Sequence, residues 1–134
     1  MTEHITMLAF PSQPQSVARV ETMVEQLANK LRIAPDTYGN ILVSLTEAVN
    51  NAIIHGNGRD ESKSVRVELL ERRGKIAFRV SDEGKGFDYN NLPDPTCSEN
   101  LCKCGGRGVF LMRELSDNIS FRNNGSTVEM QFRI

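Results

Sequence analysis

Residues 44–57, SLTEAVNNAIIHGN, limit what this chain can fold into more than any other segment. The segment has the apolar content of a buried helix, yet it carries a glutamate, asparagines and a histidine. On a helical wheel one face holds the apolar residues Leu42, Leu45, Val49 and Ala52. The opposite face holds a polar stripe of Asn40, Ser44, Glu47, Asn51 and His55. We therefore predict a helix that packs on a core with one face and presents polar groups to a site with the other.

The bulk composition predicts one cytoplasmic domain. A chain of 134 residues is long enough for a single core and too short for two. Its 16 basic and 17 acidic residues give a net charge of -1, which favours neither nucleic acid nor an anionic membrane as partner. We expect no signal peptide, because acidic Glu3 stands near the start and no long apolar run follows. No segment approaches the roughly 20 apolar residues of a membrane span.

The first half of the chain predicts a strand and two helices. Residues 3–10 form a short apolar run, and Ser12 with Gln15 offers a capping box for the helix that follows. Apolar residues recur at helical spacing from Val17 to Leu31. We expect Asp36 to cap a second helix, which carries the polar stripe and ends at Gly56 in the left-handed conformation.

The second half predicts two hairpins around a loop and a short helix. Residues 64–71 and 75–82 alternate apolar and polar side chains, as do residues 118–123 and 126–134. In the last strand we expect Val128, Met130, Phe132 and Ile134 to point inward. Residues 88–104 show no periodicity and are interpreted as a lid, and residues 108–115 as a helix. The predicted fold is α+β, with helices on one face of a mixed, mostly antiparallel sheet.

Three polar elements are candidates for a site, and each also has an ordinary structural interpretation. Glu47 and Asn51 are one helical turn apart, which is also typical of a solvated face. Residues 82–86, DEGKG, follow a strand as a simple turn does. Residues 105–108, GGRG, offer bare backbone N–H groups and Arg107 to a phosphate at a helix start. His55 near a helix end also suits the helix dipole alone.

Taken together and in this order, these elements resemble the GHKL ATPase superfamily, and within it the small RsbW-type anti-sigma factors that are serine-protein kinases. EAVNNAIIHG is similar to the N-box of that family, DEGKGFD to its first glycine box and GGRGVFLM to its second. LPDPTCSENLCKCGGRG resembles its ATP lid, at about residues 88–105, and NGSTVEMQF its terminal strand. The resemblance covers essentially the whole chain. It implies one histidine kinase-like ATPase domain over residues 1–134, a two-layer sandwich of the Bergerat type.

The resemblance also implies a role for each matching residue. Glu47 matches the glutamate that orients or deprotonates the attacking nucleophile, and Asn51 matches the asparagine that binds Mg²⁺. Asp82 matches the aspartate that accepts a hydrogen bond from the adenine amino group. The other implied nucleotide contacts are His55, Gly84, Gly86, Gly105, Gly106, Arg107, Gly108 and Thr127. The terminal strand departs from the usual Gly-Thr of the family, because Ser126 stands between Gly125 and Thr127.

The function implied is ATP- and Mg²⁺-dependent phosphorylation of a STAS-domain anti-sigma-factor antagonist, combined with sequestration of a sigma factor. A homodimer is also implied, and the first strand and the helix after Ser12 could supply its interface. The alternative is a protein-binding module that switches with its nucleotide and transfers no phosphoryl group. A histidine kinase fragment ranks below both, because neither His4 nor His55 lies in a phosphoacceptor helix. Cys97, Cys102 and Cys104 are interpreted as reduced spectator thiols in preference to a zinc site.

Overall fold

The computed structural model describes residues 4–85 and 106–134. The predicted lid, with Gly86, Gly105 and the three cysteines, therefore lies outside the described residues. Three short turns, η1 (Pro14–Ser16), η2 (Ala52–Gly56) and η4 (Asn123–Gly125), join the main elements. The helices and strands are β1 (His4–Pro11), α1 (Val17–Leu31), α2 (Pro35–Asn51), β2 (Ser64–Arg72), β3 (Lys75–Ser81), α3 (Gly106–Leu115), β4 (Asn118–Arg122) and β5 (Thr127–Arg133).

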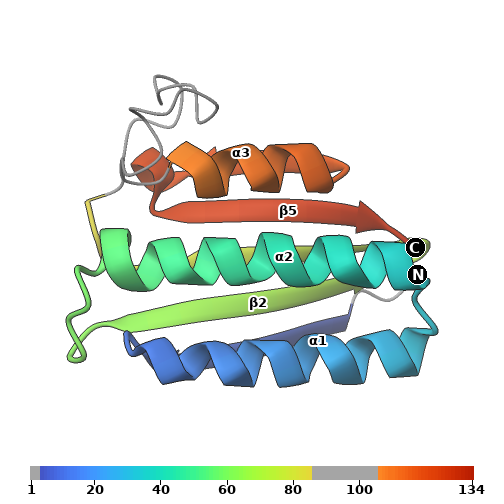
Figure 1. Cartoon of the computed structure of the whole chain (residues 1–134), viewed down its shortest axis with the longest axis horizontal. Coiled ribbons are helices and arrows are strands. Elements are labelled where there is room, and N and C mark those ends of the chain that lie inside the picture. The colour runs from blue at the N-terminus through green and yellow to red at the C-terminus, as the bar shows by residue number, and fades with distance from the viewer. Residues whose placement is uncertain (1–3, 86–105) are drawn as a thin grey trace.

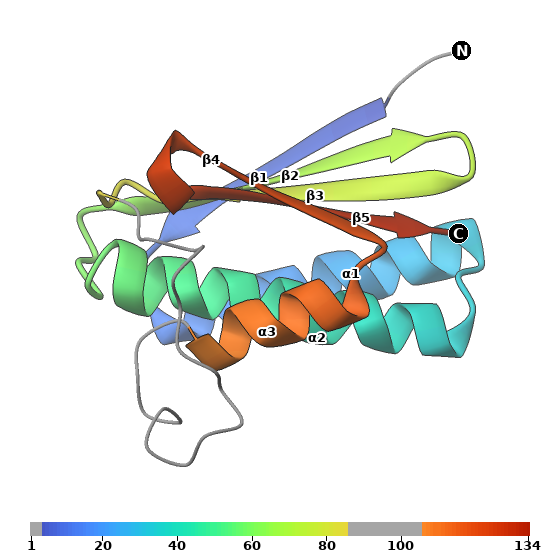
Figure 2. The same ribbon diagram turned by 90° about the horizontal axis from the view of Figure 1, so that it is seen from above.

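The described strands form one sheet, and the helices cover one of its faces. The strand order is β1-β2-β3-β5-β4, and every pairing between these strands is antiparallel. Seen from above, α1, α2 and α3 form a layer beneath the sheet (Figure 2). α2 is the middle helix of the three (Figure 1). The predicted α+β fold is confirmed, and this part of the chain holds no parallel strand pair. None of its helices combines the length and apolar character that crossing a membrane requires.

The core lies between the two layers and contains the apolar residues that the periodicities predicted. Phe78 of β3 and Phe132 of β5 meet edge to face with ring centroids 6.1 Å apart. Val128 and Met130 are buried on the same face of β5, as expected. The prediction for Ile134 is wrong, because its side chain is 46% exposed. Ile134 follows the last residue of β5, so it extends past the part of the strand that the helices cover.

The start of α1 differs from the predicted capping box. Ser12 is buried, and its hydroxyl donates to the backbone carbonyl of Lys63 at 2.8 Å instead of capping the helix. Ser16 occupies the N-cap position, and its hydroxyl donates to the Pro11 carbonyl at 3.0 Å without capping the helix. The local sequence pattern failed here because a partner 51 residues away satisfies the Ser12 hydroxyl.

Both ends of α2 also differ from the prediction. Ala34 is the N-cap, followed by Pro35 at the first helical position. Asp36 lies in the first turn and makes no capping hydrogen bond, although a carboxylate there still suits the helix dipole. Gly56 does not adopt the left-handed conformation; Gly58 does, with φ of 59°. The chain instead leaves α2 through one turn of π-helix, a geometry that is often found at functional sites.

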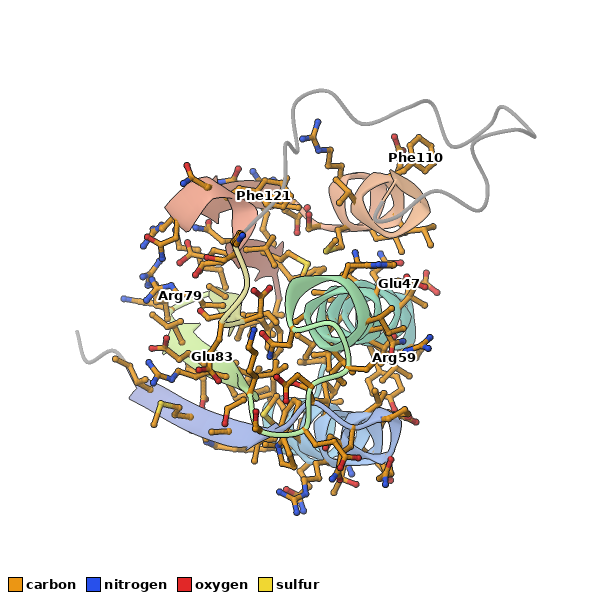
Figure 3. The ribbon with its side chains drawn as sticks, turned by 90° about the vertical axis from the view of Figure 1, so that its left-hand side faces the viewer. Glu47, Arg59, Arg79, Glu83, Phe110 and Phe121 are labelled. Carbon is orange, nitrogen blue, oxygen red and sulfur yellow. The ribbon has the colours of Figure 1, made fainter. Side chains whose placement is uncertain are left out.

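The uncovered face of the sheet carries a network of ion pairs. Arg79 Nη2 donates to Glu129 Oε1 at 2.8 Å, and Arg122 approaches the same carboxylate at 3.7 Å. Figure 3 shows Arg79 on the side of the sheet that faces away from the helices. Burial alone would raise the pKa of Glu129, but hydrogen bonds from Arg79 and Gln131 and the charges of Arg79 and Arg122 lower it below its usual value. Glu129 is therefore ionised and paired at neutral pH.

Candidate functional site

Glu47 and Asn51 lie one turn apart on α2 and face the first turn of α3. A Cβ atom added at Gly108 would be 2.7 Å from Asn51 Nδ2 and 3.1 Å from Glu47 Oε2. Figure 3 shows Glu47 on the part of α2 that approaches α3. Only glycine at position 108 allows the backbone of α3 to come this close to both side chains. Glu47, Asn51 and Gly108, which come from two of the three candidate elements, therefore lie side by side in the structure.

The residues of the polar stripe differ in how far they are buried. Asn40 and His55 are exposed, whereas Glu47 and Asn51 are half-buried. Ser44 was expected on the polar face, but it is completely buried. Ser44 Oγ and Asn51 Nδ2 are buried polar atoms without a hydrogen-bond partner among the described residues. Buried polar groups usually have partners, so the unpaired Asn51 amide indicates that a group beyond these residues completes this position.

Asp82 lies directly on the backbone that ends the helical segment. A Cβ atom at Gly56 would be 2.3 Å from Asp82 Cγ, and one at Gly84 would be 2.0 Å from the Gly56 carbonyl oxygen. The Gly84 N–H donates to Asp82 Oδ1 at 2.8 Å, and the Asp82 N–H donates to the Ser126 carbonyl at 2.9 Å. Two glycines without side chains thus let the loop after β3 contact the end of α2, and the contact fixes the Asp82 carboxylate.

Two titratable groups near the end of η2, Asp82 and His55, have pKa values that are shifted from their usual values. Burial raises the pKa of Asp82, and the opposing effects of the Gly84 N–H and the Lys63 charge are smaller. Partial burial and the nearby Arg59 charge both lower the pKa of His55, so the imidazole is neutral at pH 7. His55 therefore offers a neutral hydrogen-bonding group and not a cation to a ligand.

Asn57 is a residue of this region that sequence reasoning missed. It is 3% exposed, and its side-chain amide joins four segments. Nδ2 donates to Ser12 Oγ at 2.8 Å and to the Ser64 carbonyl at 3.0 Å, while Oδ1 accepts from the Glu83 N–H at 2.7 Å. In the sequence Asn57 reads as one more residue of a helix-ending turn. The only available signal was an asparagine immediately after the candidate site helix.

The other predicted site residues in the described part of the chain are Gly106 and Arg107 on α3 and Thr127 on β5. Gly106 and Arg107 begin α3, and the Arg107 side chain belongs to the part of the chain that the structure does not describe. The Thr127 hydroxyl donates to Ser81 Oγ at 3.1 Å. Because Val128 points into the core, the neighbouring Thr127 points to the opposite, uncovered face of the sheet. The structure therefore does not bring Thr127 together with Glu47, Asn51 and Asp82.

A divalent cation at this site would depend on few protein ligands. Within residues 4–85 and 106–134, no three His, Cys, Asp or Glu side chains come together as a metal site requires. The Glu47 carboxylate and the Asn51 amide nevertheless offer hard oxygen atoms on one helix face. This donor set fits Mg²⁺, which is typically bound through one or two protein groups plus substrate phosphates and water.

With this geometry described, the chain can be assigned to a family. It belongs to the histidine kinase-like ATPase domain family, whose model matches residues 10–132. This is a family of ATP-binding domains, and the match includes all three candidate elements.

Several relatives with known names align with most of this chain. The serine-protein kinase RsbW of Bacillus subtilis is 25% identical over 130 residues, covering 92% of this chain and 81% of the relative. The protein of the same name from Listeria monocytogenes is 26% identical over 137 residues, covering 97% and 87%. A solved structure of RsbU and RsbW domains from Mycobacterium tuberculosis superposes with a TM-score of 0.67 at 15% identity. It covers 97% of this chain and 32% of the other, and it supports the fold.

Proposed function

We propose that this protein is an ATP-dependent serine/threonine protein kinase that regulates a sigma factor by partner switching. The observation that carries the proposal is the position of the Glu47 carboxylate beside the Asn51 amide, at the first turn of α3. A module that only binds nucleotide has no evident need for a carboxylate among phosphate charges. Two relatives that carry the name serine-protein kinase align with this chain over most of their length, which supports the same activity.

In the proposed reaction Glu47 acts on the hydroxyl of the protein substrate. Its carboxylate orients the serine or threonine hydroxyl and accepts its proton as the oxygen attacks the γ-phosphorus of ATP. The bond from the γ-phosphorus to the bridging oxygen breaks, and ADP leaves with the bonding electrons. The backbone N–H groups at the start of α3, with the positive end of the helix dipole, face the phosphates.

Asn51 and Asp82 would hold the two ends of the nucleotide. The Asn51 side-chain oxygen would ligate a Mg²⁺ ion, which when bound neutralises phosphate charge during transfer. Asp82 would accept a hydrogen bond from the adenine amino group, with Gly84 allowing the base close to the backbone. His55, Gly86, Gly105, Gly106 and Arg107 complete the set that the family resemblance proposes as nucleotide contacts and that the structure does not turn away from the site.

The proposed partners are those that the resemblance to RsbW-type anti-sigma factors implies. The phosphoryl acceptor is a STAS-domain anti-sigma-factor antagonist, and the competing partner is a sigma factor. We also propose a homodimer and a cytoplasmic location, where ATP and sigma factors are both present. A single-protomer mass in light scattering at micromolar concentration would contradict the dimer.

The test is phosphoryl transfer from labelled Mg-ATP to the STAS-domain protein encoded nearest to this one. Replacing Glu47 by Gln keeps the size and removes the base, so transfer should fall by roughly 10²- to 10⁴-fold while ATP affinity stays within about threefold. Glu25→Gln is the matched control, because Glu25 is an exposed residue of α1.

The outcomes separate the two functions. Label on a serine or threonine of the STAS-domain protein, lost in Glu47→Gln and kept in Glu25→Gln, supports the kinase. A Glu47→Gln variant with full transfer would remove Glu47 from the proposed role. Tight ATP binding by the wild type without transfer to any STAS-domain protein tested would favour a nucleotide-dependent binding module.

A further inference from the structure

Asn57 stands where the helical segment carrying Glu47 and Asn51 ends. Its backbone N–H donates to the Ala52 carbonyl at 2.8 Å, a bond five residues back that completes the π-turn. The side chain is turned inward and nearly fully buried. The same residue therefore closes the helix with its backbone and leaves its side-chain amide for other partners.

The partners of this amide fix its orientation. Oδ1 accepts from the Glu83 backbone N–H, which is only a donor, and Nδ2 donates to the Ser64 backbone carbonyl, which is only an acceptor. The second Nδ2 hydrogen reaches Ser12 Oγ, whose own hydroxyl donates to the Lys63 carbonyl. Both donors of the amide are used. A carboxylate or an aliphatic side chain at position 57 cannot reproduce this set of bonds.

The hydrogen bond between Asn57 and Glu83 lies next to the contact between Gly56 and Asp82. Gly56 touches the Asp82 carboxylate, and the next residue on each segment, Asn57 and Glu83, share a hydrogen bond. The Glu83 carboxylate in turn accepts from the Ser64 N–H, which gives the loop a second attachment to the start of β2. The loop after β3 is thus attached to the end of η2 by one contact, at Gly56, and one hydrogen bond, at Asn57.

We propose that Asn57 is a positioning residue for base recognition: it holds the loop of residues 82–84 so that the Asp82 carboxylate meets the adenine amino group. Asn57 itself touches no nucleotide and acts through Asp82. The inference rests on the proposed nucleotide contact of Asp82, but not on phosphoryl transfer. It assigns selectivity for a 6-aminopurine over guanine to a buried amide that lies behind Asp82.

The experiment measures equilibrium affinity for Mg-ATP and Mg-GTP by titration calorimetry, without a protein partner. Asn57→Ala should bind ATP about tenfold more weakly, as expected when one well-placed hydrogen bond is lost. The ratio of ATP to GTP affinity should fall by a similar factor, because guanine carries an oxygen at C6 in place of the 6-amino group that Asp82 would select. Ser16→Ala is the control, since it removes a side-chain hydrogen bond of another buried residue, to the Pro11 carbonyl, and no bond to Asn57 or to residues 82–84.

A double-mutant cycle with Asp82→Ala separates positioning from a general loss of structure. If Asn57 acts through Asp82, adding Asn57→Ala to Asp82→Ala should weaken ATP binding by less than about twofold. If Asn57→Ala does not fold, Ser12→Ala replaces it in both backgrounds, because it removes the acceptor of one Nδ2 bond. Its expected effect is about threefold and in the same direction.

A tenfold loss that persists in the Asp82→Ala background, or an unchanged ATP-to-GTP ratio in a folded variant, overturns the proposal. Failure of the proposed kinase function gives a different result. In that case the wild type binds ATP without transferring phosphate, and the cycle between Asn57 and Asp82 still shows the predicted coupling.

Discussion

Gly56→Ala tests whether the contact between the end of η2 and Asp82 determines nucleotide binding. The backbone of Gly56 has no left-handed φ, so alanine is compatible with the local conformation. Its Cβ atom would nevertheless lie 2.3 Å from both Asp82 Cγ and Asp82 Oδ2. Ordinary contacts between such atoms begin near ~3.4 Å, so the carboxylate must move by more than ~1 Å. A displacement of this size would break the hydrogen bond that we propose between Asp82 and the adenine base.

The expected effect on binding is larger than the effect on stability. A hydrogen bond to a charged group contributes roughly 1.5–3 kcal/mol, which corresponds to a roughly ten- to hundredfold loss of ATP affinity. Replacing glycine by alanine also reduces the freedom of the unfolded chain, worth about 0.4–1 kcal/mol, and this offsets part of the steric cost. We therefore expect Gly56→Ala to remain folded, with a free energy of unfolding within about 1 kcal/mol of wild type.

Titration calorimetry with Mg-ATP and urea denaturation measure these two quantities. Gly39→Ala is the matched control, because Gly39 lies inside α2 and an added Cβ meets nothing within 4 Å. That control should bind ATP normally and gain roughly 0.5–1 kcal/mol from its higher helix propensity. A Gly56→Ala protein that binds ATP within twofold of wild type would refute the assigned role of this contact.

Three further substitutions test other parts of the structure. Gly108→Ala would place a Cβ 2.7 Å from Asn51 Nδ2 and force α3 away from α2, so phosphoryl transfer should fall at least about tenfold in the kinase assay. Because burial raises the pKa of Asp82, its ionised form destabilises the fold; Asp82→Asn should become more stable than wild type as pH rises through the carboxylate range, measured by urea denaturation, while ATP affinity falls. Burial opposes ionisation of Glu129, but hydrogen bonds from Arg79 prevail and lower its pKa; Glu129→Gln should therefore lose stability at neutral pH, and the difference from wild type should vanish in acid below that pKa.

The sequence predicted the elements well where one periodicity extends over several turns or residue pairs. The apolar spacing from Val17 to Leu31 became α1, and the alternation in residues 64–71 and 75–82 became the β2–β3 hairpin. These predictions succeeded because burial of one face imposes the same spacing on any sequence that adopts the element. Element ends were predicted less well. Ser12 fits a local capping pattern, but a distant carbonyl provides a better partner in the folded chain.

The candidate site was predicted only as far as a single helix or a single motif defines it. The one-turn spacing of Glu47 and Asn51 follows from helix geometry, so the sequence alone could place them together. The position of Thr127 could be predicted only with knowledge of which face of β5 its side chain occupies. In the fold this side chain points away from the other candidates. The burial of Ser44 depends on how other elements pack against α2, which the periodicity of α2 does not contain.

By itself the sequence determined the helices and strands, the α+β class and the N-box pair, because all of these depend on residues close together along the chain. Only the tertiary structure decided that Gly56 touches Asp82 and that Asn57 bonds to Glu83, 26 residues later. Such contacts join segments whose separation no local pattern encodes. They form because the fold brings the residues after β3 beside the residues after α2. There Gly56 leaves room for the Asp82 carboxylate, and the Asn57 side chain accepts a hydrogen bond from the Glu83 N–H.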